Sequence, residues 1–185
     1  MDVRLRIRPL ERGDNRTGFR CGEPRLDEYI RRYAAQNQFR HHLGVTYVVV
    51  DEPTREVVGY VTLAAASIAP EALPGGRARS TPYSEVPVLR LARLAVDERA
   101  QGVGLGSELL RYALGVALAQ ARSVGCVGVV VDAKPAAVGF YARYGFAPCP
   151  EVSGGLAARP RHEMLFLPLA CVEAAVGEPP PAGPV

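Results

Sequence analysis

The chain has 185 residues, 48% of them hydrophobic, and a formal net charge of +3; this size predicts one domain that buries roughly two-thirds of its unfolded surface. Its apolar runs are too short for a secretion signal or a membrane span, so a membrane protein is excluded and a cytoplasmic location is expected. The four cysteines are widely spaced and form no C-x-x-C pair, which indicates buried free thiols rather than a disulfide framework or a zinc site.

The first part of the chain is predicted to form a strand, a helix and a hairpin. Residues 3–8 alternate apolar and charged side chains, as a half-buried strand does. Pro24 suits the first position of a helix whose apolar residues recur at helical spacing, and Gly44 is the expected stop. Two β-rich runs at residues 45–51 and 57–66 then predict a β-hairpin.

A long loop and a strand–helix–strand unit follow. Residues 67–85 are rich in proline and glycine, which predicts a loop that is functional or mobile. A strand is expected at residues 88–96 and a long helix at residues 105–124, whose wide apolar stripe implies packing on a sheet. The continuous apolar run at residues 126–131, which ends in Asp132, is typical of a central buried strand.

The last elements are a short helix at residues 135–144 and two strands at residues 146–149 and 163–169. We expect the domain to span residues 1–170. The remaining residues, 171–185, are rich in proline and glycine and are expected to form a disordered tail.

A glycine-rich segment connects the strand that ends at Val96 to the long helix. Glycine lets the backbone approach an anion closely, and the first amides of the helix point at that anion. Two kinds of phosphate loop do not fit: a dinucleotide fingerprint needs glycine where Ser107 stands, and a P-loop needs a lysine that is missing here. The pattern that does fit is [RQ]-x-x-G-x-[GA], formed by Gln101, Gly102, Val103, Gly104, Leu105 and Gly106. A tight turn that only keeps the helix close to the sheet is the structural alternative.

This loop and its surroundings resemble the GNAT superfamily of N-acetyltransferases. Residues 91–97 resemble its fourth strand, and residues 129–133 and 139–146 resemble its fifth strand and the helix after it. The resemblance implies an α/β (α+β) fold: a mixed, mostly antiparallel twisted sheet of about six to seven strands, splayed between strands 4 and 5 and flanked by helices. It also implies acetyl-CoA as cosubstrate and no metal.

The resemblance assigns site residues as well. Leu94, Ala95 and Val96 would hold the pantetheine arm as an added strand is held. The loop residues 101–106 and Ser107 would bind the pyrophosphate, with Asp132 and Phe140 also at the cofactor site. Tyr141 matches the tyrosine that many members aim at the coenzyme A sulfur, where a phenol can protonate the departing thiolate. The structural alternative is an aromatic core residue, a role that fits Tyr144 better.

No carboxylate occurs between residues 86 and 96, where many members carry a general base. Direct attack by an amine that is already largely neutral near pH 7 to 8 would fit this absence. The α-amine of an aminoacyl ester would qualify, because its pKa lies below that of a lysine side chain.

Three further segments, at residues 19–38, 59–64 and 86–97, resemble the GNAT toxins of bacterial toxin–antitoxin pairs. The resemblance implies acetylation of the α-amine of aminoacyl-tRNA, inhibition of translation, a ribbon-helix-helix antitoxin as partner, and a homodimer. Arg90 and Arg93 would then meet the tRNA.

The basic residues are consistent with that substrate without requiring it. Almost all are arginine, with Lys134 the only lysine, and arginine binds phosphate through a planar fork. A solvated surface explains them equally well. Two other functions stay open: a GNAT enzyme acting on a protein N-terminus, a lysine or a small amine, and a non-catalytic regulator that binds acetyl-CoA.

Overall fold

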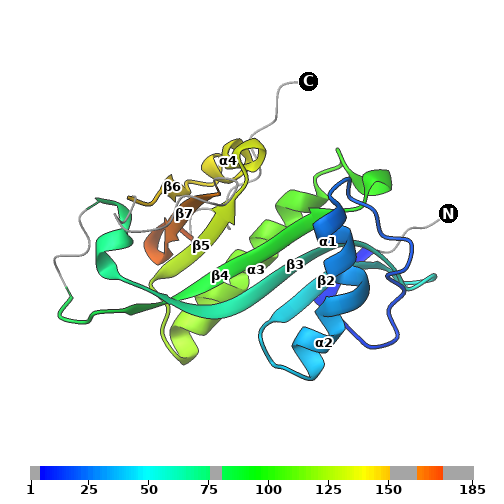
Figure 1. Cartoon of the computed structure of the whole chain (residues 1–185), viewed down its shortest axis with the longest axis horizontal. Coiled ribbons are helices and arrows are strands. Elements are labelled where there is room, and N and C mark those ends of the chain that lie inside the picture. The colour runs from blue at the N-terminus through cyan, green and yellow to red at the C-terminus, as the bar shows by residue number, and fades with distance from the viewer. Residues whose placement is uncertain (1–4, 76–80, 151–161, 173–185) are drawn as a thin grey trace. The chain divides into compact units, whose positions relative to one another are not determined.

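Seven strands form a mixed sheet in the computed structural model, which describes residues 5–75, 81–150 and 162–172. Their order is β1-β2-β3-β4-β5-β7-β6, with β4 and β5 parallel and the pairs β1–β2, β2–β3, β5–β7 and β6–β7 antiparallel. The strands are β1 Leu5–Pro9, β2 Val45–Asp51, β3 Glu56–Ile68, β4 Val86–Val96, β5 Gly128–Ala133, β6 Ala147–Pro148 and β7 Glu163–Pro168. The expected mixed sheet flanked by helices is confirmed (Figure 1).

Helical segments lie at the three predicted places, and two short 3-10 turns, η2 and η4, lie in segments predicted as a loop and a turn. They are α1 Pro24–Glu28, η1 Tyr29–Tyr33, α2 Ala34–Phe39, η2 Pro70–Ala72, η4 Glu98–Ala100, α3 Leu105–Ser123 and α4 Pro135–Ala142. Among the described residues, no helix combines the length and the apolar character that crossing a membrane requires.

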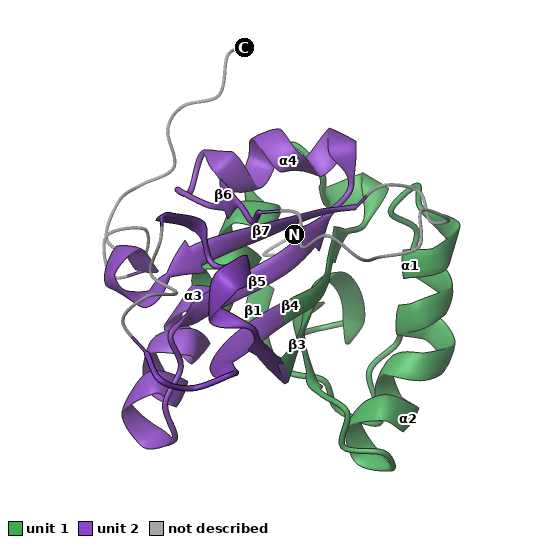
Figure 2. Ribbon diagram, turned by 60° about the vertical axis from the view of Figure 1, so that its left-hand side comes forward, with its two compact units in different colours: residues 1–64, 91–113 green, residues 65–90, 114–185 purple. Residues whose placement is uncertain are grey.

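The chain divides into two compact units, coloured separately in Figure 2. Unit 1 contains residues 1–64 and 91–113, and unit 2 contains residues 65–90 and 114–185. Because β3, β4 and α3 each contribute residues to both units, the units share these elements. Each unit has its own core.

The core of unit 1 lies between the strands and the N-terminal helical segment. Buried side chains from β2 and β3, including Val48, Val50 and Tyr60, pack against Phe19, Tyr29, Ile30 and others from the N-terminal segment. This follows from the alternation along β2, which sends every second valine to the helical side. Gly59 allows α3 to approach closely, since a Cβ there would lie 3.2 Å from Leu109 Cδ1 and 3.3 Å from Val49 Cγ2.

The N-terminal helix differs from the regular helix predicted between Pro24 and Gly44. The segment Tyr29–Tyr33 is a π-helix, in which the amide of Ala34 donates to the carbonyl of Tyr29 five residues back. The hydroxyl of Tyr60 donates to the carbonyl of Leu26 at 2.9 Å, and a side chain inserted into the helical ladder is a known cause of such irregularity.

The end of this helix also differs from the prediction. The last α-helical residue is Phe39, and the amides of Arg40 and His41 both donate to the carbonyl of Gln36. His42 then adopts a φ of 52°, in the left-handed region, which ends the helix before Gly44.

The core of unit 2 lies around β5 and β7. Val130 and Phe166 are direct partners in the antiparallel pair and pack with Val86 and Val88 of β4. The predicted loop at residues 67–85 starts later than expected, because β3 continues to Ile68. Ala72 and Leu73 then pack into this core, so the first part of the segment is structured; residues 76–80 lie outside the described range.

The four cysteines are free, as predicted. Of these four, only Cys126 is buried, while Cys21 and Cys149 are half-buried and Cys171 is exposed.

The start of the expected C-terminal tail is packed against the domain. Val172, the second residue of that tail, is fully buried. Residues 173–185 lie outside the described range, and the boundary at residue 170 stays a prediction.

Candidate functional site

The loop between β4 and α3 has the backbone that a phosphate site requires. Gly102 and Gly104 have φ angles of 79° and 91°, a left-handed conformation that glycine adopts without steric cost. The carbonyl of Gly104 accepts hydrogen bonds from Ser107 N at 3.0 Å and Glu108 N at 3.1 Å, which starts α3. The first amides of a helix have no partner within the helix and carry the positive end of its dipole, so they can bind an anion.

Gln101 braces this loop from within. Its Nε2 donates to the carbonyl of Val96 at 2.9 Å and to the carbonyl of Cys21 at 3.2 Å. The amide side chain therefore ties the loop to the end of β4 and to the segment before α1. The sequence pattern identified Gln101 as a loop residue but carried no signal for these contacts.

Asp97 is a second residue that stabilises this loop, and no sequence pattern predicted it as a site residue. Its side chain is 1% exposed and accepts hydrogen bonds from Arg20 N at 3.0 Å, Arg99 N at 3.1 Å and Arg99 Nε at 2.8 Å. Burial alone would raise the pKa of Asp97, but the hydrogen bonds from Arg99 and from the two backbone amides outweigh it and lower that pKa. The signal available was an aspartate just before a short helical turn, a usual capping position.

The end of β4 offers mainly backbone groups to a ligand. Of the three residues expected to hold the pantetheine arm, Ala95 is buried in the core of unit 1, while Leu94 and Val96 are partly exposed. The carbonyl of Val96 is occupied by Gln101. The amide of Asp97 donates to the carbonyl of Val58 at 2.9 Å, which joins the end of β4 to β3.

The expected residues of unit 2 cluster around α4. Tyr141 is 6% exposed and packs edge-on against Phe140 and Phe146, with 5.1 and 5.5 Å between the ring centroids. Burial raises the pKa of the Tyr141 phenol above its ordinary value, so the hydroxyl keeps its proton at neutral pH and can act as a donor. Tyr144, expected to be the better core residue, is less buried than Tyr141, although its hydroxyl oxygen is inaccessible and has no partner among the described residues.

Arg90 and Asp132 form an ion pair in unit 2. Arg90 Nη2 lies 3.1 Å from Asp132 Oδ2, and both side chains are close to half exposed. Pairing partly compensates the charge of Arg90. Arg93, in unit 1, instead stacks on Tyr29, with its Cζ 3.7 Å from the ring centroid. The two arginines expected to meet tRNA therefore have different surroundings.

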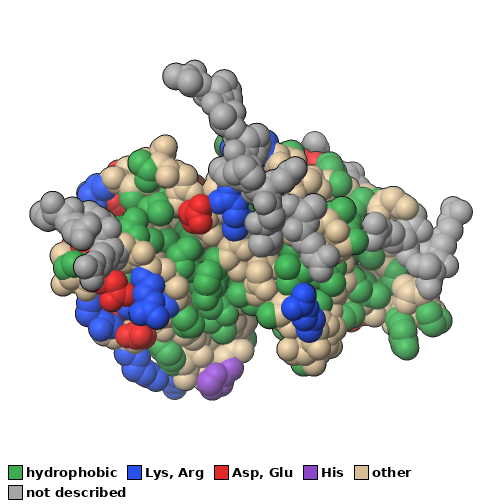
Figure 3. All heavy atoms as spheres, turned by 180° about the vertical axis from the view of Figure 1, so that it is seen from behind, with side chains coloured by type: hydrophobic (Ala, Val, Ile, Leu, Met, Phe, Trp, Pro, Cys, Tyr) green, Lys and Arg blue, Asp and Glu red, His purple; other side chains and the backbone are tan. Residues whose placement is uncertain are grey.

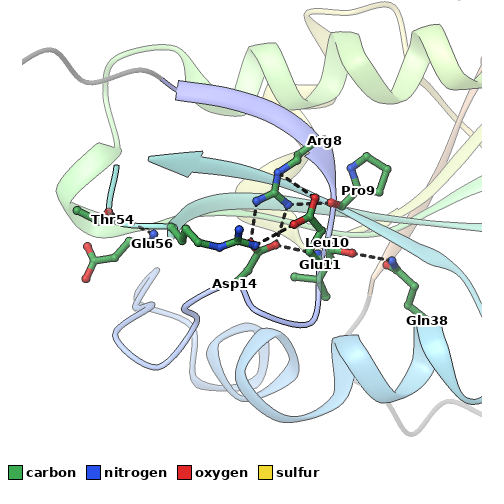
Figure 4. Close-up of polar contacts among 9 residues, drawn as sticks. Arg8, Pro9, Leu10, Glu11, Asp14, Gln38, Thr54 and Glu56 are labelled. Carbon is green, nitrogen blue, oxygen red and sulfur yellow. Dashed lines mark hydrogen bonds and ion pairs between the residues drawn. The ribbon is translucent and has the colours of Figure 1, made fainter. Parts of the chain in front are cut away.

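Three other arginines, Arg8, Arg55 and Arg111, are also paired with carboxylates. Arg8 and Arg55 share the buried Asp14, with distances of 2.7 and 3.1 Å to its Oδ1 (Figure 4). Arg111 pairs with Glu108 at 2.6 Å. On the face drawn in Figure 3, basic side chains mostly lie beside acidic ones. The pairing favours structural roles for these arginines over a continuous basic surface.

The family of the chain follows from comparison with known proteins. A family model described as the acetyltransferase (GNAT) family matches residues 7–146. The chain belongs to the acetyltransferase (GNAT) family. It is therefore an N-acetyltransferase that uses acetyl-CoA, as expected from the loop. Within the described part of this GNAT chain, no three His, Cys, Asp or Glu side chains gather where they could hold a metal ion.

Relatives of this GNAT chain include toxins. A curated protein named tRNA-acetylating toxin, from Mycobacterium tuberculosis, is 38% identical over 161 residues, which cover 86% of this chain and 90% of the relative. The solved structure of AtaT complexed with acetyl-methionyl-tRNAfMet has a TM-score of 0.80 and 28% identity, covering 92% of this chain and 98% of that one. A tyrosine-to-phenylalanine variant of AtaT, bound to the C-terminus of the antitoxin AtaR and to acetyl-CoA, has a TM-score of 0.73 and 25% identity, covering 94% and 99%.

Proposed function

We propose that this chain transfers the acetyl group of acetyl-CoA to the α-amine of the amino acid carried by a tRNA, and that it inhibits translation as a toxin. The observation that carries the proposal is the 38% identity, over 86% of the chain, to a tRNA-acetylating toxin. The likeness to AtaT in complex with acetyl-methionyl-tRNAfMet supports it.

The donor site is assigned to the following residues. Residues 102–107, at the left-handed turns and the start of α3, bind the pyrophosphate, and the donors are the amides of residues 102–106, because the amide of Ser107 already donates to Gly104. Gln101 and Asp97 keep that loop in place. The backbone of Leu94, Ala95 and Val96 holds the pantetheine arm, and Phe140 and Asp132 belong to the cofactor side of unit 2.

Tyr141 is assigned as the general acid. The neutral α-amine attacks the thioester carbonyl, the carbon–sulfur bond breaks, and the phenol of Tyr141 gives its proton to the departing thiolate. The proton lost by the amine passes to solvent, from which the phenol is reprotonated. No carboxylate is needed to activate the amine, because an α-amine with a pKa near 8 is partly neutral at physiological pH, and β4 carries none between Val86 and Val96.

The partners follow from the same reasoning. A toxin that acts on aminoacyl-tRNA works in the cytoplasm, where the tRNA is charged. We assign Arg93 and Arg90 to the acceptor side, an antitoxin as the neutralising partner, and a homodimer as the assembly.

The test is to incubate the full-length protein with labelled acetyl-CoA and bulk aminoacylated tRNA. Label on the aminoacyl-tRNA, released by mild alkaline hydrolysis as an N-acetylamino acid, is the expected result. Label only on protein N-termini, lysines or small amines, together with harmless overproduction in bacteria, would defeat the proposal. Binding of acetyl-CoA without any transfer would identify a regulator instead.

The assignment of Tyr141 has its own test. Tyr141→Phe should lower kcat by about 10²- to 10⁴-fold, the usual contribution of a general acid, while the Kd for acetyl-CoA stays within about twofold. Tyr144→Phe, one helical turn away, is the matched control and should keep kcat. Near-normal turnover of the Tyr141→Phe enzyme would remove Tyr141 from the mechanism.

A further inference from the structure

Arg93 rests on a column of aromatic rings in unit 1. Its guanidinium carbon lies 3.7 Å from the centroid of Tyr29, well inside the range of a cation–π contact. Tyr29 stacks on Tyr60 with 6.1 Å between ring centroids and an interplanar angle of 28°. Tyr60, which is fully buried, meets the edge of Phe19 at 5.4 Å. The platform beneath Arg93 is therefore anchored in the core.

The backbone under this platform is irregular. Tyr29 is the first residue of the π-helical segment, and its carbonyl accepts from Ala34. The hydroxyl of Tyr60 donates to Leu26, one turn earlier. Isolated π turns occur often at functional sites. Here the π turn begins at the residue that supports Arg93.

Arg93 also differs from its neighbouring arginines in having no carboxylate partner among the described residues. Arg90 and Arg99 of the same region each lie within 3.1 Å of a carboxylate oxygen, whereas Arg93 forms no ion pair with the residues that the structure describes. Its guanidinium is therefore not held by a carboxylate of that part of the chain, and its plane is set by a ring. A planar guanidinium held in this way can bind a phosphate through two parallel hydrogen bonds.

We propose that Tyr29 is a positioning residue that holds the guanidinium of Arg93 ready to bind a phosphate of the acceptor substrate, a backbone phosphate near the 3′ end of the aminoacyl-tRNA. This inference rests on the proposed function. Acetyl-CoA also carries phosphates, but Arg93 lies three residues before Val96 in β4, about 10 Å along the strand at roughly 3.3 Å per residue. The pyrophosphate loop begins only beyond that point.

The experiment compares Arg93→Gln, Tyr29→Leu and Tyr29→Phe in the full-length enzyme. Arg93→Gln and Tyr29→Leu should each raise the KM for aminoacyl-tRNA by about 5- to 30-fold, the range of a largely desolvated cation–π contact, with kcat and the KM for acetyl-CoA within twofold. Tyr29→Phe keeps the ring and should restore the KM. The slope of log KM against log salt should fall by about 0.7 in both affected variants, as for the loss of one phosphate contact on a single strand.

Two controls separate positioning from general damage to the core. Phe19→Leu removes another buried ring of the same column, which does not contact Arg93 directly, and should leave the KM and the salt slope of the folded enzyme unchanged. In an Arg93→Gln background, Tyr29→Leu should raise the KM for aminoacyl-tRNA by less than a further twofold, because both changes remove the same contact.

Three results would overturn the inference: an unchanged KM for aminoacyl-tRNA in Tyr29→Leu, an additive effect of the two changes, or a rise in the KM for acetyl-CoA instead. Anisotropy binding of a labelled acceptor-stem RNA to the same variants provides a second readout. Tyr29-dependent binding without acetyl transfer by the wild-type enzyme would contradict the proposed function and support the positioning role.

Discussion

Replacing Asp97 by alanine removes the acceptor of four hydrogen bonds, one from Arg20 and three from Arg99, that join the end of β4, the η4 turn and the segment at Arg20. Two of the donors are backbone amides in part-buried hydrogen bonds, and leaving such a donor without a partner costs at most about 1–3 kcal/mol each. The Arg99 side chain is 60% exposed, so its contribution is screened and adds less than about 1 kcal/mol. Asp97→Ala should therefore lower the free energy of unfolding by about 2–6 kcal/mol.

The pH dependence of this loss has a definite sign. Because the folded protein lowers the pKa of Asp97, the stabilisation is complete above the ordinary carboxyl pKa of about 3.9. It disappears as the pH falls below that value and through the folded pKa. The difference between wild type and Asp97→Ala should be constant from about pH 5 to pH 7 and shrink below about pH 4.

The assay is urea unfolding followed by circular dichroism, together with the KM for acetyl-CoA. A displaced loop should raise that KM by about tenfold or more, since small misplacements of binding groups have large effects. Glu98→Ala is the matched control, because Glu98 is the exposed neighbour, and it should change stability by less than about 0.5 kcal/mol. Equal stability of the two variants, or an unchanged KM in Asp97→Ala, would refute this account of the loop.

Two further changes test the same structure. Gly104→Ala should lower the free energy of unfolding, measured by heat or urea, by about 1–2 kcal/mol. The φ of Gly104 is 91° and no atom lies within 4 Å of the new Cβ, so this cost is conformational and not steric crowding. Gly115→Ala, inside α3 and equally uncrowded, is the control and should raise the free energy of unfolding by about 0.5–1 kcal/mol. Asp14→Asn should cost about 3–5 kcal/mol, because the side chain is fully buried between Arg8 and Arg55. Burial opposes ionisation of Asp14, but the contacts with Arg8 outweigh it and lower the pKa of Asp14. The extra stability of wild type over Asp14→Asn should therefore disappear below about pH 4. An equal stability difference at pH 3 and pH 7 would contradict a stabilising role of the ionised carboxylate.

The regular elements could be predicted because their patterns are local. The hairpin of β2 and β3, the long helix α3 and the buried strand β5 all follow from apolar periodicity. Gly102 and Gly104 of the loop follow from a local pattern too, since glycine adopts a left-handed conformation more readily than any other residue.

The features that could not be predicted depend on contacts between distant residues. The π turn accompanies a hydrogen bond from Tyr60 to Leu26, 34 positions apart. Asp97 and Gln101 brace the loop through partners 77 and 80 positions away. A local sequence pattern does not predict contacts between distant residues, and the ion pair of Arg90 with Asp132 could not be predicted for the same reason.

The π turn at Tyr29–Tyr33 limits which insertions and deletions this chain tolerates. A π turn corresponds to one residue more than an α-helix would use, so deleting one residue there could restore regular helical hydrogen bonds. Yet residues before the deletion would rotate by about 100° relative to those after it. Ala34 and Ile30 are both fully buried, so a shortened helix would have to expose one side of the core or turn Tyr29 away from Arg93. The deletion would thus make the helical hydrogen bonds regular but would lose packing in the core. The number of residues in this helix is therefore constrained as well as their identity.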